Sequence, residues 1–229
     1  MRYFASLMFL VGLLLGCSKA TPSPTIEEEI AALPDVWNPQ YAWDVTSNNW
    51  NMLTRITAMT NELEKIRLIK VLTKRFQHDP DWYLAHLEET RRKGFDHRLS
   101  FVWAAVWSLT LDKKASPHTI LTGWQLVSDL QTRLDFFKLA TQEIFDKGKP
   151  ERDGTNEKGD RWHFAWKIRD RNEMYFRFQF ADEVYLSYNN LPEEYRPAFV
   201  EQIKRDFFHR PEMKFVDRSR LPEAFRQGE

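Results

Sequence analysis

The chain has 229 residues and carries 33 Lys and Arg against 33 Asp and Glu, so its formal net charge is zero. A balanced charge argues against a nucleic-acid partner, which requires a basic surface, and against a polybasic surface for anionic lipids. The single cysteine excludes an intrachain disulfide, so stability must come from packing, to which 17 Phe and 9 Trp contribute large apolar surfaces.

The first seventeen residues have the composition of an export signal. Arg2 is followed by an apolar run that reaches Leu15, and then by Gly16 and Cys17. A basic start, a short apolar core and a small-residue exit are the three parts of a secretory signal. The apolar run is shorter than the roughly 18 residues that a transmembrane helix needs. We therefore expect residues 1–16 to be a signal peptide that is removed.

The segment Leu14-Leu15-Gly16-Cys17 resembles the lipobox of bacterial lipoproteins, in which a signal peptidase cuts before an acylated cysteine. This resemblance covers only the leader. It implies that Cys17 is the mature N-terminus and carries an S-linked diacylglycerol and an N-linked fatty acid such as palmitate. Two acyl chains already hold a protein stably on a membrane. An ordinary secreted protein that keeps a cysteine at this place is the alternative.

The residue after the cysteine bears on the destination. In lipoproteins of Gram-negative bacteria an aspartate at this place signals retention in the inner membrane, and here the residue is Ser18. We therefore expect an outer-membrane anchor with the folded part facing the periplasm, and an inner-membrane location stays open. Residues 17–25 contain prolines and small polar residues, a composition that predicts an extended, lipidated tether.

Residues 26–147 predict a helical region. A short helix is expected from Glu27 to Leu33, and a long helix follows Asn49. The apolar residues of the long helix step by three or four: Leu53, Ile56, Met59, Leu63, Ile66, Ile69, Leu72 and Phe76.

On the exposed side of this long helix, charged residues of opposite sign stand three apart. We expect Glu62 to pair with Lys65, and Glu64 to pair with Arg67, because residues at this spacing are neighbours on a helix surface.

Three further helices are expected before residue 148. Asp79-Pro80 and Ser116-Pro117 each combine a cap with a proline in the first turn, which predicts helix starts. The segment Leu99–Leu111 is apolar on nearly every side and predicts a helix in the centre of a bundle. The helix after Pro117 carries an apolar stripe and is expected to stop at Gly148.

Residues 148–229 predict a different architecture. Apolar and polar residues alternate in three segments, and this period of two is typical of strands. The apolar members are Trp162, Phe164, Trp166 and Ile168, then Met174, Phe176, Phe178 and Phe180, then Val184, Leu186 and Tyr188. We predict a three-stranded antiparallel meander, followed by a C-terminal helix over Pro197–Phe208. The predicted fold is α+β and mostly α, with this part packed on the helical region as one domain.

The search for chemistry gives no motif. His78, Asp79, Asp81, His86 and His97 are the nearest group of metal-ligand residue types, but no two histidines are four apart and HExxH is absent. We therefore expect no metal and no cofactor.

Two other patterns have structural explanations. The loop from Asp153 has Lys158 and Phe164 where an EF-hand needs glycine and glutamate. Ser116 stands near His118 but is expected to be a helix cap. No catalytic residue is identified, and a non-enzymatic role is favoured.

The aromatic residues outside a clear period are Trp37, Tyr41, Trp43 and Trp50. An exposed platform of such rings can stack on sugars, although a loop folded onto the core explains them as well. We predict a membrane-anchored, periplasm-facing lipoprotein with a non-enzymatic binding role. Its partner would be an envelope assembly protein or, if this protein is an immunity-type lipoprotein, a toxic effector that acts in the periplasm. A cell-wall hydrolase or glycan-binding lipoprotein is the alternative.

Overall fold

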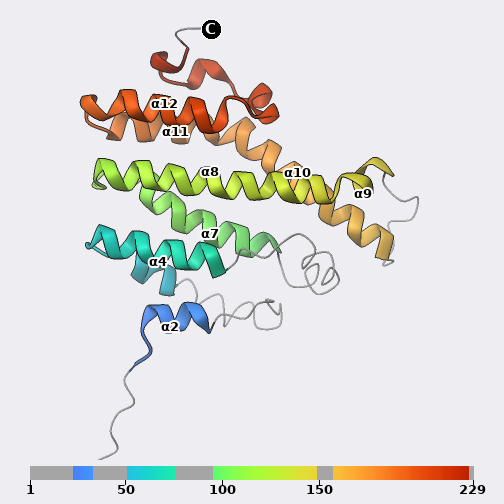
Figure 1. The fold of residues 1–229 in the computed structure, drawn as a ribbon, viewed down its shortest axis with the longest axis horizontal. Coiled ribbons are helices and arrows are strands. Elements are labelled where there is room, and N and C mark those ends of the chain that lie inside the picture. Colours follow the sequence, from blue (N-terminus) through green and yellow to red (C-terminus); the bar gives the residue numbers. More distant parts are fainter. Residues whose placement is uncertain (1–22, 33–50, 76–94, 149–156, 227–229) are drawn as a thin grey trace, which may run out of the picture.

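The computed structural model describes residues 23–32, 51–75, 95–148 and 157–226. These residues form helices stacked in layers, with α2 at one edge and α12 with the C-terminal segment at the other (Figure 1). The α-helices are α2 (Ile26–Ala31), α4 (Glu62–Arg75), α7 (Phe95–Thr110), α8 (Pro117–Ala140), α9 (Gln142–Asp146), α10 (Glu157–Phe178), α11 (Phe180–Asn190) and α12 (Arg196–Phe207), and residues 51–57 are also helical. Within these ranges, no helix is both long and apolar enough to cross a bilayer.

The predicted three-stranded meander is wrong, because α10 and α11 occupy its place and the described residues contain no strand. The alternating residues divide into pairs four apart: Phe176 and Phe180 are buried, whereas Met174 and Phe178 are exposed. Residues four apart lie on the same face of a helix, so the period of two came from two opposite helical faces. The described part is therefore all helical, and the α+β assignment is corrected.

The predicted long helix after residue 49 is divided in two. Its first part ends at residue 57, and α4 begins at Glu62. Asn61 caps α4, since its side chain accepts a hydrogen bond from the backbone N–H of Glu64 at 3.2 Å. The break changes which residues face the core, and Leu63, which the apolar stripe placed inside, is exposed.

The two ion pairs predicted on this helix have different outcomes. Glu64 and Arg67 do pair on the surface, with the closest oxygen and nitrogen 2.8 Å apart. The surface pairing of Glu62 with Lys65 is wrong because Lys65 is buried. Its ammonium group donates to the carbonyl of Ser108 at 3.3 Å, in the last turn of α7, where a cation is favoured by the helix dipole.

Other helix predictions are confirmed. The helices expected at residues 27–33, 99–111 and 197–208 correspond to α2, α7 and α12. α7 lies between α4 and α8, as its uniformly apolar surface predicted (Figure 1). Gly148 adopts a positive φ of 74° after α9, and its N–H donates to the carbonyl of Phe145 at 3.0 Å, which is the expected helix stop. The single long helix expected between Pro117 and Gly148 is, however, divided at Thr141 into α8 and α9.

Ser116 caps α8, as its sequence position predicted. Its hydroxyl accepts a hydrogen bond from the backbone N–H of Thr119 at 3.3 Å. Glu62 of α4 accepts hydrogen bonds from the Ser116 backbone N–H at 2.8 Å and from the hydroxyls of both residues. Burial opposes ionisation of Glu62, but these hydrogen bonds and the charge of Lys65 outweigh it and lower the pKa of the carboxyl. α4 and α8 are thereby joined through one carboxylate.

The core between α8, α11 and α12 is organised around Trp124, whose side chain is fully buried. Its indole makes edge contacts with Phe180, Phe199 and Phe207, with ring centroids 5.7 to 5.9 Å apart. The indole N–H donates to the hydroxyl of Ser187 at 2.9 Å. That hydroxyl donates to the carbonyl of Thr110, at the end of α7, also at 2.9 Å. The chain of hydrogen bonds therefore connects α8, α11 and α7.

The C-terminal segment after α12 is folded onto the helices. It forms the short 3-10 helices η3 (Pro211–Phe215), η4 (Arg218–Arg220) and η5 (Glu223–Phe225), after η2 (Glu193–Tyr195) earlier in the chain. Met213, Val216, Leu221 and Phe225 are buried. Lys138 of α8 pairs with Glu212, and the buried Arg210 pairs with Asp135, so α8 holds this segment by charge as well as by apolar contact.

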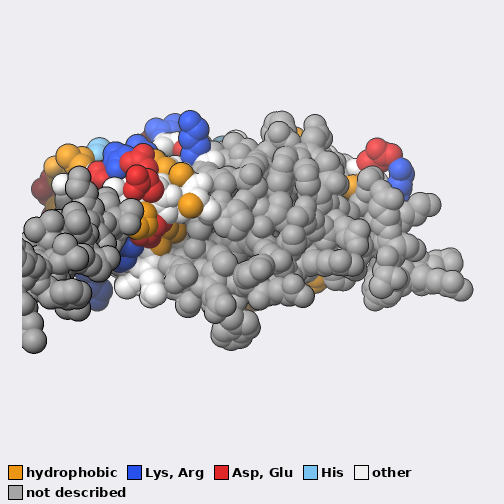
Figure 2. All heavy atoms as spheres, turned by 90° about the horizontal axis from the view of Figure 1, so that it is seen from below, with side chains coloured by type: hydrophobic (Ala, Val, Ile, Leu, Met, Phe, Trp, Pro, Cys, Tyr) orange, Lys and Arg blue, Asp and Glu red, His pale blue; other side chains and the backbone are white. Residues whose placement is uncertain are grey.

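The described surface mixes charges of both signs. Figure 2 shows acidic and basic side chains next to one another on the face that carries α2 and α4. The ion pairs of α2 fit this view, since Glu27 lies 2.6 Å from Arg67 and Glu29 lies 2.7 Å from Arg55. Neighbouring charges of opposite sign cancel, so this part of the face has no strong field of one sign.

Candidate functional site

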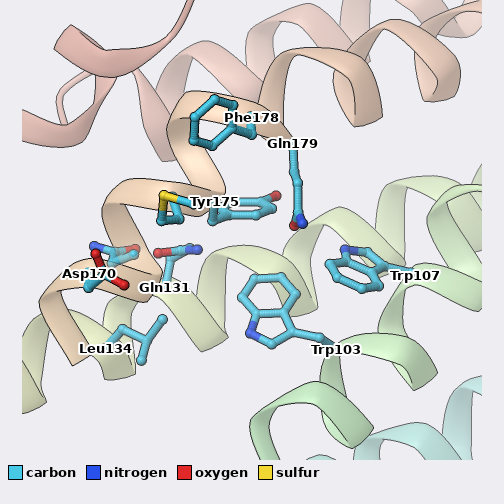
Figure 3. Close-up of a pocket in the computed structure, with 10 residues that line it drawn as sticks. Trp103, Trp107, Gln131, Leu134, Asp170, Tyr175, Phe178 and Gln179 are labelled. Carbon is cyan, nitrogen blue, oxygen red and sulfur yellow. The ribbon is translucent and has the colours of Figure 1, made fainter. Parts of the chain in front are cut away.

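A cavity of about 570 Å³ lies between α7, α8 and α10 (Figure 3). Its volume is in the range of small-molecule sites, which are mostly apolar and carry a few placed polar groups. The residues that line it are Trp103 and Trp107 from α7, Gln131 and Leu134 from α8, Asp170, Asn172, Met174, Tyr175 and Phe178 from α10, and Gln179.

Aromatic rings form the walls of this cavity. Trp103 and Trp107 are one turn apart on α7, with ring centroids separated by 5.8 Å. The Trp103 ring lies 5.1 Å from the ring of Tyr175, which comes from α10 (Figure 3). Phe178 adds a ring that is 53% exposed. The walls therefore offer flat apolar faces, part of them open to a ligand.

Two of the lining residues carry buried amide side chains that have no hydrogen-bond partner among the described residues. Gln131 is 0% exposed and Asn172 is 1% exposed. Neither the oxygen nor the nitrogen of either amide has a hydrogen-bond partner among the described residues. An unpaired buried polar group costs about 1–3 kcal/mol, and native proteins keep such groups rare. A ligand that pairs with these amides would recover this free energy.

Tyr175 is held in place from behind the wall. Its hydroxyl donates to Oε2 of Glu183, on α11, at 3.0 Å. Burial raises the pKa of Glu183 to about 8, even though the hydrogen bond from the Tyr175 hydroxyl acts in the opposite direction. Burial and the nearby Glu183 raise the pKa of Tyr175 as well. At neutral pH both groups are therefore protonated, and the wall beside the cavity is uncharged.

The mouth of the cavity carries polar groups. Asp170 and Gln179 are exposed lining residues. Asp170 is the one carboxylate among the described lining residues, and none of them is basic or a histidine. Glu183 lies behind Tyr175 and does not line the cavity. The arrangement can hold a neutral molecule by stacking and hydrogen bonding, and it offers no pair of groups for acid–base chemistry.

A second aromatic group lies where α9 meets α10. The rings of Phe145, Trp162 and Trp166 are nearly parallel, with successive centroids 6.4 and 6.5 Å apart. The guanidinium of Arg169 lies 4.2 Å from the centre of the Phe145 ring, a cation–π contact. Trp166 is 40% exposed, so α10 presents apolar surface at this end as well as at the cavity.

Most sequence-predicted site residues lie outside the described residues. This applies to Cys17, to the aromatic residues Trp37, Tyr41, Trp43 and Trp50, and to the histidine–aspartate group at residues 78–86. The backbone of His97 belongs to α7. No three His, Cys, Asp or Glu side chains in the part of the chain that the structure describes are grouped as metal ligands. His118 is exposed, and the neighbouring Ser116 serves as a cap.

The cavity residues were missed from sequence, although one signal was present. Gln131 stands seven residues after Trp124 and four after Val127, which places a polar side chain on the buried stripe of α8. A polar residue at a core position marks either a buried hydrogen-bond network or a ligand site. Asn172 had no comparable signal because it lay in the predicted turn between two strands.

Comparison of the chain with protein-family models, with curated proteins and with solved structures gives no match.

Proposed function

We propose that this protein is a lipid-anchored binding protein of the bacterial envelope, which holds a neutral ligand in the cavity between α7, α8 and α10 without transforming it. The lipobox-like segment ending at Cys17 supports the anchor, with the folded part facing the periplasm from the outer membrane. The observation that carries the binding role is the pair of buried, unpartnered amides of Gln131 and Asn172 in a cavity walled by aromatic rings.

The composition of the cavity supports binding over hydrolysis. A glycoside hydrolase uses two carboxyl groups that flank the scissile bond. Among the described lining residues Asp170 alone carries one, and it is exposed. The protonated Glu183 is separated from the cavity by Tyr175. The hydrolase alternative therefore has no acid–base pair at this site, whereas a binding role uses each group that the site contains.

The experiment is recovery of the resident ligand. The full chain is isolated from its native membrane under mild conditions, and native mass spectrometry records any molecule that stays bound. We expect a neutral ligand on the unaltered protein and its loss from Gln131→Leu. Gln125→Leu is the matched control, because Gln125 lies on the exposed side of the same helix, bonded to Asp129 at 3.2 Å. A ligand that remains equally bound to Gln131→Leu would contradict the proposal.

A protein partner is a second candidate, favoured by the exposed apolar side chains along α10 and α11. Trp166, Met174, Phe178, Tyr185 and Leu186 are 40% to 53% exposed. Exposed large apolar side chains of this kind mark an interaction surface where they form one contiguous patch. Cross-linking from a photoreactive residue at Tyr185, compared with the same residue at the exposed Glu201 of α12, tests this candidate. A partner captured at both positions, or at neither, would contradict it.

A further inference from the structure

The cavity selects a ligand by charge. None of the described lining residues is basic, and the exposed Asp170 at the mouth disfavours an anion. A cation would meet only the carboxylate of Asp170 among the described lining residues, whose exposure to solvent weakens ion pairing, because Glu183 lies behind Tyr175 in its protonated form. A neutral ligand is neither repelled by Asp170 nor dependent on a buried counter-charge.

The buried amides select a ligand by its hydrogen-bonding groups. A side-chain amide offers a donor and an acceptor at once. A second amide pairs with it in both directions, through one N–H and one carbonyl. A hydrocarbon chain would leave Gln131 and Asn172 unpaired in a drier site, which costs free energy for each amide. The ligand therefore carries at least one neutral amide or an equivalent donor–acceptor pair.

The aromatic walls and the polar mouth select a ligand by shape. Phe178 is 53% exposed and offers a flat face, whereas Trp103 and Tyr175 are 7% exposed and pack on each other behind it. The C–H face of a saturated ring can stack on such an exposed aromatic ring. At the mouth, Asp170 accepts hydrogen bonds and Gln179 both donates and accepts. Hydroxyl groups on the edge of a ring can donate to the Asp170 carboxylate and both donate to and accept from the Gln179 amide.

We propose that the cavity binds a pyranose ring that carries an acetamido group, as part of a glycan chain. The ring stacks on the aromatic walls, its hydroxyls reach Asp170 and Gln179, and its acetamido group pairs with the buried amides of Gln131 and Asn172. This proposal rests on the proposed function of the cavity and adds the chemical class of its ligand.

The test uses the full chain in lipid nanodiscs, titrated while its tryptophan fluorescence is recorded. The probes are the disaccharide of N-acetylglucosamine, cellobiose, which has the same linkage without acetamido groups, and a blocked alanine dipeptide. We expect the acetylated disaccharide to bind at least ten-fold more tightly than cellobiose, because only it pairs with the amides. Gln131→Leu and Asn172→Leu should each weaken this binding about ten-fold, and Gln125→Leu should leave it unchanged.

A stability measurement separates recognition from a structural role. Because the amide of Gln131 has no described partner, Gln131→Leu should leave the thermal midpoint of the ligand-free protein unchanged or raise it while binding falls. A lower midpoint together with weaker binding would show that Gln131 supports the fold and would overturn its assignment to the ligand.

The remaining outcomes distinguish the two proposals. Equal binding of cellobiose and the acetylated disaccharide would overturn acetamido recognition. Tighter binding of the dipeptide would replace the sugar by a peptide and leave the binding cavity in place. Binding of none of the probes, with a native ligand still lost from Gln131→Leu, would overturn the sugar alone. Absence of both probe binding and a native ligand would overturn the proposed function as well.

Discussion

The substitution Glu183→Gln should stabilise this protein at neutral pH, although it removes a native buried carboxyl. Burial raises the pKa of Glu183 from its ordinary value of 4.5 to about 8. Between these two values the unfolded chain is ionised while the folded chain keeps the proton. The contribution of Glu183 to stability is therefore most favourable below pH 4.5 and becomes less favourable as the pH rises towards 8, by about 1.4 kcal/mol for each pH step. At pH 7 the buried carboxyl costs about 3 kcal/mol.

Glutamine avoids this cost because it does not ionise, and its carbonyl can accept the hydrogen bond from Tyr175. The new N–H₂ group of the glutamine would be buried without a partner, and this cost reduces the gain in stability by about 1 kcal/mol. We expect a net gain of about 2 kcal/mol in the free energy of unfolding at pH 7, and no gain at pH 4.5. Urea titrations of both proteins, followed by circular dichroism at several pH values, measure the difference.

Glu173→Gln is the matched control on the exposed side of α10, where the carboxylate pairs with Arg177. It should change stability by less than about 1 kcal/mol. A Glu183→Gln protein that is no more stable than its parent at pH 7, or a difference that does not depend on pH, would refute the reasoning.

Three more predictions concern packing, charge and the anchor. Gly123→Ala should destabilise the fold by about 1–3 kcal/mol, because the added Cβ would lie 2.7 Å from Cγ2 of Thr110. Thr110→Ser removes that methyl group and should restore part of the lost stability. A Gly123→Ala protein that is more stable than its parent in thermal melts would contradict the close approach of α7 and α8. The lowered pKa of Glu62 means that its contribution is present above the ordinary pKa of 4.5 and is lost as the pH falls through the lower folded value. Glu62→Gln should therefore flatten the acid side of the stability–pH curve, and an unchanged curve in urea titrations would contradict this. Cys17→Ser should abolish fatty-acid labelling and release the protein from the membrane fraction or stall it as a precursor, whereas unchanged labelling would exclude the lipobox interpretation.

The sequence was informative where local chemistry decides the structure. Ser116 followed by a proline predicts the start of α8, and Gly148 predicts the helix stop, because caps and positive φ angles depend on single residues. The apolar residues on every side of α7 predict its central place because nothing else can cover them. These features need no knowledge of distant contacts.

The sequence was misleading where two explanations share one pattern. From the end of α10 into α11, an exposed pair (Met174 and Phe178) and a buried pair (Phe176 and Phe180) interleave, and the result is the alternation of a strand. Exposed aromatic residues cause this ambiguity, since the pattern assumes that each apolar residue is buried. The unbroken run without glycine or proline from residue 161 to residue 191 was evidence for a helix, because the turn predicted at residues 170–173 contained neither of the two strongest turn-forming residues, although Asp170 and Asn172 are compatible with a turn.

The cavity depended on contacts that no local pattern contains. Gln131 and Asn172 are 41 positions apart on different helices, and their shared burial follows from the packing of α8 against α10. Lys65 gives the same lesson, because its partner carbonyl belongs to Ser108 on α7. Polar residues on an apolar stripe can be recognised from sequence, but their partners, or the lack of them, cannot.

The layered order of the helices has a consequence for how the chain acquires its structure. Most of these helices pack on a helix close to them in the sequence: α2 on α4, α4 on α7, α7 on α8, α8 on α10 and α10 on α11, whereas α12 returns to α8. Contacts between sequence neighbours close short loops, and proteins rich in them fold rapidly. Because a chain is synthesised from its N-terminus, each of these layers finds its earlier partner already present. The segment at residues 211–226 then joins the stack last, beside α8 and α10.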